Sequence, residues 1–158
     1  MRASLKVLIL SAMMISAALA AQACAVPANA DALRAELLAL VNAERARAGL
    51  ARLGPSPRLD QAAQHVSCDN ARRGRLSHTT ADGSDLGGRL RTVGYRFRMG
   101  NENIAWNRSG PRAAVQSWMG SSGHRANLLD RQSREFGGAV AQAPSGQLFW
   151  TMVTAAAR

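Results

Sequence analysis

The stretch FGGAVAQAPSGQLFWTMVT, residues 136–154, decides the fold class. Its two halves, residues 136–141 and 148–154, are apolar runs of strand length, and Pro144-Ser145-Gly146 between them is typical of a β-hairpin turn. The segments before this hairpin have helical periodicity instead. Helices first and the clearest strands last predict an α+β fold with a small antiparallel sheet, and argue against a doubly wound parallel sheet.

Working back from the hairpin, apolar residues recur at helical spacing. Asp31 is expected to cap the first helix, Pro57 to open the second, and Pro111 to open a later one. Residues 100–106 are expected to be a loop that passes into a short strand. We also expect all three tryptophans to lie in the core, because large aromatic side chains usually bury most of their area. The helices are expected over residues 31–48, 57–73, 85–93 and 111–122, with a further turn over residues 124–129.

The N-terminal segment is typical of a secretory signal peptide, expected over residues 1–20. It has a basic start, an apolar run and a small-residue cleavage site, and the run is too short to span a bilayer comfortably. Residues 21–30 are expected to be a linker and residues 31–158 a single domain. The prediction is a secreted or periplasmic protein with no transmembrane segment after cleavage. A retained anchor, or a lipoprotein attached through Cys24, is the alternative.

The charge of the chain is strongly basic. There are 20 Lys and Arg residues against 10 Asp and Glu, a formal net charge of +10, and nearly all the basic residues are arginines. The arginines are scattered and are not interleaved with aromatic residues, so we predict no nucleic-acid partner. An anionic cell envelope is the partner that this charge favours.

The two cysteines, Cys24 and Cys68, permit one disulfide in an exported chain. Such a bond would tie the N-terminal arm to the second helix. The alternatives are two free thiols, or a Cys24 that is lipidated or removed. Nothing in the sequence fixes the distance between the two residues, so these alternatives stay open.

Five segments, in order, resemble the CAP superfamily, also known as the SCP or cysteine-rich secretory family, in its bacterial extracellular form. The resemblance covers the chain from about residue 31 to its end, and it implies a three-layer α-β-α sandwich around a central antiparallel sheet. The segments are Leu40-Val41-Asn42-Ala43-Glu44-Arg45, Leu76-Ser77-His78, Asn101-Glu102-Asn103-Ile104-Ala105, Gly123-His124-Arg125-Ala126-Asn127-Leu128-Leu129 and Glu135-Phe136-Gly137-Gly138-Ala139-Val140.

The resemblance also implies a polar cleft. Members of the family often place two histidines and two acidic residues around a central cavity, which sometimes binds zinc. His78, Glu102 and His124 match three of these positions, whereas Ser121 stands where animal and plant members have the second glutamate. The set implied by the resemblance is therefore incomplete.

From the sequence alone, the spacing of the candidate ligands argues against a bound metal. Two imidazoles and one carboxylate are a reasonable zinc set, with His78 and His124 as the expected ligands, but their spacing is long and no His-Glu-x-x-His helix is present. The alternative is that all three residues only stabilise local backbone. A serine nucleophile at Ser121 is not expected, because the glycine spacing does not match a nucleophile elbow.

Two further residues are assigned to the cleft. Glu135 precedes a strand and could reach it, or pair with a nearby arginine instead. Asn103 is expected to fix loop backbone through its side chain.

These observations favour a binding or interaction protein at the cell envelope over an enzyme. The first alternative is a zinc-assisted hydrolase of envelope material, with Glu102 as a ligand or general base. The second is a carrier of lipid or sterol. The ligand itself is not predicted, because a fold does not specify function.

Overall fold

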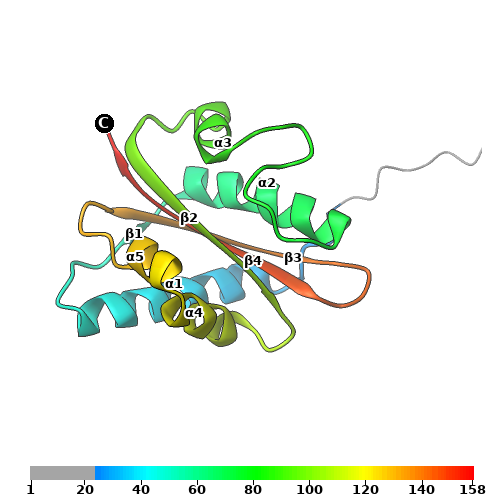
Figure 1. Cartoon of the computed structure of the whole chain (residues 1–158), viewed down its shortest axis with the longest axis horizontal. Coiled ribbons are helices and arrows are strands. Elements are labelled where there is room, and N and C mark those ends of the chain that lie inside the picture. The colour runs from blue at the N-terminus through cyan, green and yellow to red at the C-terminus, as the bar shows by residue number, and fades with distance from the viewer. Residues whose placement is uncertain (1–23) are drawn as a thin grey trace, which may run out of the picture.

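The computed structural model describes residues 24–158, so the expected signal peptide lies outside the described residues. The chain forms three layers, in which α2 and α3 cover one face of a sheet and α1, α4 and α5 cover the other (Figure 1). The α+β sandwich inferred above is confirmed. The elements are α1 (Ala30–Arg47), β1 (Gly54–Pro55), α2 (Pro57–Arg73), α3 (Leu86–Thr92), β2 (Phe97–Asn107), α4 (Pro111–Gly120), α5 (Ser122–Leu128), β3 (Glu135–Gln142) and β4 (Leu148–Ala157).

The sheet has the order β1-β3-β4-β2. The predicted hairpin forms its centre, with β3 and β4 antiparallel, and β2 pairs with β4 along almost its whole length, from Phe97↔Ala157 to Asn107↔Leu148. β2 is therefore an edge strand, and the view of Figure 1 looks onto it. Residues placed on β2 lie between the two helical layers.

Helix α2 packs directly on the backbone of β3. A Cβ added at Gly137 would lie 2.2 Å from the backbone carbon of Leu59, so this position requires glycine for close approach. Asp60 reinforces the contact by accepting a hydrogen bond of 2.9 Å from the Gly138 N–H. The Gly137-Gly138 pair in the hairpin therefore sets the distance between sheet and helix.

The opposite face of the sheet carries the larger apolar cluster. Trp118 of α4 and Trp150 of β4 are fully buried there, together with Leu37 and Val41 of α1. The indole N–H of Trp118 donates to the carbonyl of Ile104, at 3.1 Å, on the outer edge of β2. Burial and this hydrogen bond hold α4 against the edge strand.

Several local predictions differ from the structure. Trp106 is 50% exposed, so the prediction that all three tryptophans lie in the core is wrong for this residue. Strand β2 has 11 residues and includes the segment expected to be loop, because pairing with β4 satisfies its backbone. Helix α1 begins one residue early, at Ala30, with Asn29 as its N-cap.

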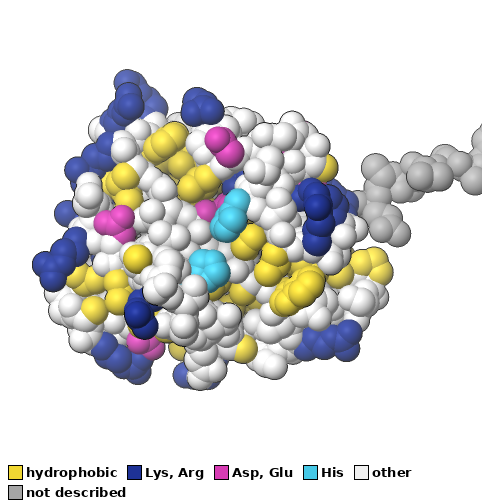
Figure 2. All heavy atoms as spheres, in the orientation of Figure 1, with side chains coloured by type: hydrophobic (Ala, Val, Ile, Leu, Met, Phe, Trp, Pro, Cys, Tyr) yellow, Lys and Arg dark blue, Asp and Glu magenta, His cyan; other side chains and the backbone are white. Residues whose placement is uncertain are grey.

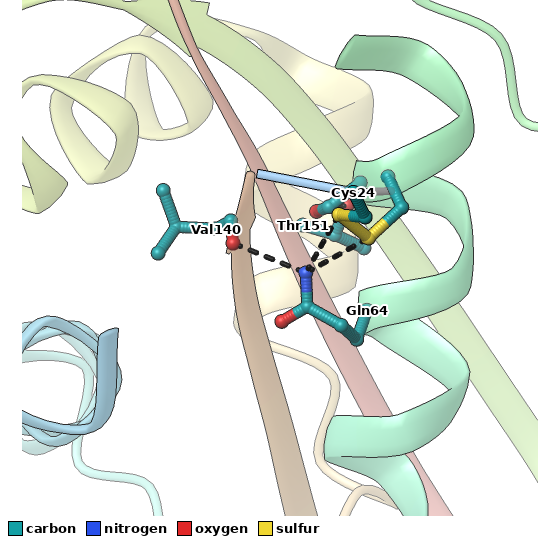
Figure 3. The surroundings of a disulfide bond; sticks show 6 residues. Cys24, Gln64, Val140 and Thr151 are labelled. Carbon is teal, nitrogen blue, oxygen red and sulfur yellow. Dashed lines mark hydrogen bonds between the residues drawn. A yellow bond between two sulfur atoms is a disulfide. The ribbon is translucent and has the colours of Figure 1, made fainter. Parts of the chain in front are cut away.

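The N-terminal arm is fixed to the domain. Cys24 forms a disulfide with Cys68 of α2, and Ala25 forms a bridge with Gln142 at the end of β3. The side chain of Gln64 lies beside the disulfide and donates to the carbonyl of Val140 at 3.1 Å (Figure 3). Part of the segment expected to be a linker is thus held on the domain. Within residues 24–158 no helix is long and apolar enough to cross a bilayer.

Candidate functional site

Glu102 lies at the centre of the candidate site, on the edge strand β2. Its side chain is only 3% exposed, so the charge of the carboxylate must be compensated by neighbours. One oxygen, Oε1, lies 2.8 Å from Nδ1 of His78, and the other, Oε2, accepts a hydrogen bond from the guanidinium of Arg89. Both carboxylate oxygens are therefore engaged by nitrogen donors from other elements.

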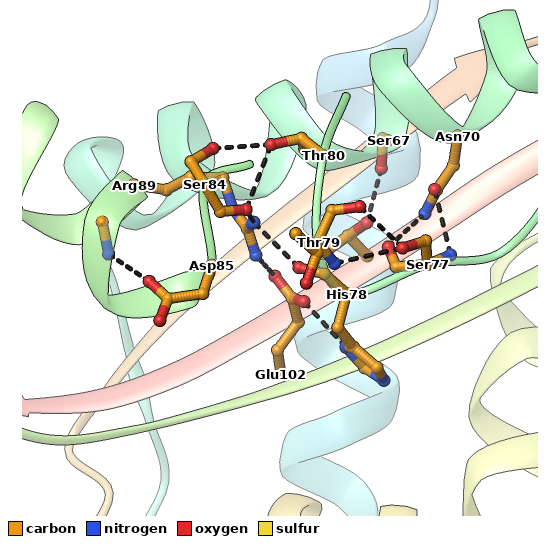
Figure 4. A network of polar contacts seen from close by, with 12 residues as sticks. Ser67, Asn70, Ser77, His78, Thr79, Thr80, Ser84, Asp85, Arg89 and Glu102 are labelled. Atoms are coloured by element: carbon orange, nitrogen blue, oxygen red, sulfur yellow. Dashed lines mark hydrogen bonds and ion pairs between the residues drawn. The ribbon is translucent and has the colours of Figure 1, made fainter. Parts of the chain in front are cut away.

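Arg89 holds this centre together. It projects from α3, is 1% exposed, and donates from a second nitrogen to the carbonyls of His78, at 3.0 Å, and Ser84, at 2.9 Å. A single guanidinium thus binds the edge strand and two points of the loop between α2 and α3 (Figure 4). The planar group of an arginine suits such a multidentate role.

The loop that carries His78 is ordered by short polar contacts. Asn70 of α2 exchanges two hydrogen bonds of 3.1 Å with the backbone of Ser77, and Asp85 caps α3 through the Gly88 N–H at 2.7 Å. Between these anchors, hydrogen bonds from Thr80 and Ser84 lower the pKa of the Asp82 carboxyl. The backbone of His78 is therefore fixed, while its side chain is 56% exposed.

His124 reaches the same site from the other helical layer. It lies on α5, and its carbonyl accepts a hydrogen bond of 2.8 Å from the amide of Asn103 on β2. Asn127, one turn further along α5, donates at 2.9 Å to the side-chain oxygen of Asn103. These contacts place the two histidines on opposite sides of the edge strand, and Figure 2 shows two histidine side chains side by side on this face.

The imidazole of His124 is influenced by burial and by His78. Partial burial lowers the pKa of His124 below its usual 6.5, and the charge of His78 lowers it further. Because the folded-state pKa lies below that of the unfolded chain, protonation of His124 opposes folding, and stability is lost as the pH falls below about 6.5. At neutral pH His124 is therefore an uncharged imidazole.

We expect an NMR titration of His124 to give a midpoint below 6.5. In the His78→Ala variant the midpoint should rise but stay below 6.5, because the charge of His78 is the smaller of the two causes and burial remains. An unchanged midpoint in that variant would show that the two imidazoles do not interact.

The other expected site residues are placed less centrally. Ser121 is the residue between α4 and α5 and makes no capping hydrogen bond through its side chain. Glu135 does not join the site: it begins β3, two strands away from β2, and lines a different cavity of about 540 Å³ together with Tyr95. Burial, with the nearby Glu135, raises the pKa of Tyr95. The amide of Asn103 donates to the backbone of α5, and not to the loop backbone that it was expected to fix.

Sequence reasoning missed Arg89 and the role of Asn127. A signal for Arg89 was present, because residues 86, 89, 90 and 93 form one helical stripe of which only position 89 is charged. A charge within an apolar stripe requires a buried partner. Asn127 stood in the sequence only as a member of the Gly123–Leu129 motif. Nothing in the spacing of that motif indicated that its side-chain amide would reach β2.

The donor groups do not fit a resident zinc ion. Catalytic zinc keeps three protein ligands, and no group of three His, Cys, Asp or Glu side chains within residues 24–158 is arranged to hold a metal. Each oxygen of Glu102 already has a nitrogen partner, and Arg89 places a positive charge beside it. Only two imidazoles remain, His78 through Nε2 and His124, and Ser121 supplies no carboxylate.

Comparison with known proteins agrees with this architecture. The family model described as CAP, the cysteine-rich secretory protein family, matches residues 38–154. The Bacillus subtilis protein YkwD is 29% identical over 125 residues, which are 79% of this chain and 48% of YkwD. The membrane protein YlbC of the same organism is 34% identical over 102 residues, 65% of this chain and 30% of YlbC. The chain thus spans about half or less of these relatives.

Solved structures share the fold. An extracellular protein containing an SCP domain from Bacillus anthracis superposes with a TM-score of 0.72 at 29% identity, over 80% of this chain and 41% of that one. An outer surface protein of Borrelia burgdorferi gives a TM-score of 0.76 at 15% identity, over 86% of this chain and 100% of that one. With the family model matching most of the chain, this protein belongs to the cysteine-rich secretory protein (CAP) family.

Proposed function

We propose that this chain is an exported binding or interaction protein, and that its ligand contacts the surface around His78 and His124. The observation that carries the proposal is that the Glu102 carboxylate is buried and paired on both oxygens. A general base needs an oxygen that can reach the substrate, but both oxygens of this buried carboxylate are already paired with His78 and Arg89. Two imidazoles, each carried by backbone that hydrogen bonds hold in place, remain for contact with a ligand.

Two observations support a location outside the cytoplasm. The Cys24–Cys68 disulfide is a feature of oxidising compartments. One of the structural relatives is described as an extracellular protein. The disulfide also uses the sulfur that a lipid anchor on Cys24 would need, which favours the unlipidated form over the lipoprotein.

Metal titration separates this proposal from the hydrolase alternative. Calorimetric titration of the purified protein with zinc chloride should show no one-to-one complex of submicromolar affinity. The His78→Ala and His124→Ala variants should give the same weak signal as the parent chain. Tight stoichiometric zinc that is lost in both variants would favour the hydrolase and count against a purely binding role.

A sedimentation assay tests the binding role directly. Lipid-extracted cell-wall material should retain the parent protein and release the His78→Ala/His124→Ala double variant, with at least a tenfold loss of affinity. The matched control is His65→Ala, since His65 is also an exposed histidine but lies on α2 near Asp82. Equal retention of the double variant and the control would reject the histidine surface as the binding site.

A further inference from the structure

One end of the molecule gathers four segments that are distant in sequence. The turn between β3 and β4, residues 143–147, lies beside the last residues of α2 and beside the N-terminal arm, with which it lines one cavity. A second cavity, of about 140 Å³, joins the same turn to Gly74 and Trp106. We call this surface, made of residues 24–26, 71–76, 106–108 and 143–147, the hairpin end.

The hairpin end carries the large exposed apolar side chains of the described chain. Within residues 24–158 these are Val26, Leu76 and Trp106, exposed by 45%, 38% and 50%. Trp106 packs only edge-on against Phe149, with ring centroids 5.7 Å apart, so much of the indole faces solvent. Figure 2 shows hydrophobic side chains extending from the histidine pair towards this end. Exposed apolar groups that cluster in this way mark an interaction surface.

The charge of the hairpin end has one sign. Its segments contain four arginines and no Asp or Glu. Arg73 pairs with the buried Asp69, whereas Arg72, Arg75 and Arg108 are exposed and make no ion pair with any residue of 24–158. Arg108 instead donates to the carbonyl of Ser145 at 2.8 Å, which holds it at the hairpin turn. The surface thus combines an indole, aliphatic groups and unpaired guanidinium groups.

We propose that the hairpin end docks on an anionic lipid bilayer surface. Indole rings favour the polar–apolar boundary of a bilayer, and arginines close to it are attracted by acidic headgroups. Docking by this end would leave the surface around His78 and His124 free for its own ligand.

Tryptophan fluorescence gives a direct measurement of this contact. Trp118 and Trp150 are at most 1% exposed, so a change in emission on adding vesicles reports on Trp106. With vesicles of equal phosphatidylglycerol and phosphatidylcholine the emission should shift to the blue, and with pure phosphatidylcholine it should not. The Trp106→Ala variant should lose the shift, and its sedimentation with the anionic vesicles should fall at least tenfold.

A charge-matched pair of variants distinguishes docking by the hairpin end from non-specific attraction between the basic protein and the anionic vesicles. Arg72→Gln/Arg75→Gln/Arg108→Gln should weaken partitioning to the anionic vesicles roughly 100-fold, about fivefold for each arginine near the surface. The control, Arg91→Gln/Arg96→Gln/Arg98→Gln, removes three exposed arginines around the start of β2, at the opposite end of that strand, and should keep the affinity within a fewfold. Equal losses in the two variants would overturn the proposal. So would binding to an insoluble anionic polysaccharide without binding to vesicles.

Discussion

Substitution of Arg89 by methionine should lower the free energy of unfolding by about 3–5 kcal/mol, because the buried charge of Glu102 would lose its main counterion. Both side chains of the pair are at most 3% exposed, so water cannot replace the guanidinium without opening the site. The carbonyls of His78 and Ser84 would lose donors at the same time. Urea unfolding of the parent and the variant measures the difference.

The matched control for this prediction is Arg91→Met on the same helix. Arg91 is exposed and makes no ion pair with the described residues, so its loss should change stability by no more than about 0.5 kcal/mol. A double variant, Arg89→Met/Glu102→Leu, should recover much of the lost stability, because replacing both charges leaves none unpaired. If Arg89→Met unfolds like the control, the ion pair does not organise the site.

Removal of the disulfide should have the second large effect. Cys24 and Cys68 are 44 residues apart, and closing a loop of that length in the unfolded chain corresponds to about 4 kcal/mol of stability in the chain-entropy model. The Cys24→Ser/Cys68→Ser variant should therefore unfold at a much lower urea concentration than the oxidised protein. The reduced parent protein, with no substitution, should behave like the variant.

The disulfide prediction has a local component as well. Without the bond the N-terminal arm is held mainly by the Ala25–Gln142 bridge, so the amide of Gln142, which donates to the Ala25 carbonyl at 2.7 Å, should exchange hydrogen faster while the other paired amides of β3 and β4 stay protected. A Gln142 amide that exchanges at an unchanged rate after removal of both sulfurs would show that other contacts fix the arm, and that the bond contributes little.

Much of the fold followed from local pattern. The apolar runs on either side of Pro144-Ser145-Gly146 predicted the hairpin that forms the centre of the sheet, and Pro57 and Pro111 marked helix starts that the structure has. Such signals act over a few residues, because capping, turn geometry and side-chain period are properties of neighbours in the chain. The motifs also indicated the family to which the chain belongs.

The site depended on contacts that no local pattern encodes. His78, Glu102 and His124 come from a loop, a strand and a helix, and only the pairing of β2 with β4 and the packing of α3 and α5 on either side bring them together. Tertiary packing also determined three other features. It left Trp106 exposed, brought Arg89 to Glu102 as its partner, and placed Glu135 on a strand away from the site. Sequence specified the residue types and the elements, whereas the burial of each charge, which determines what it can bind, arose only when the layers closed around the sheet.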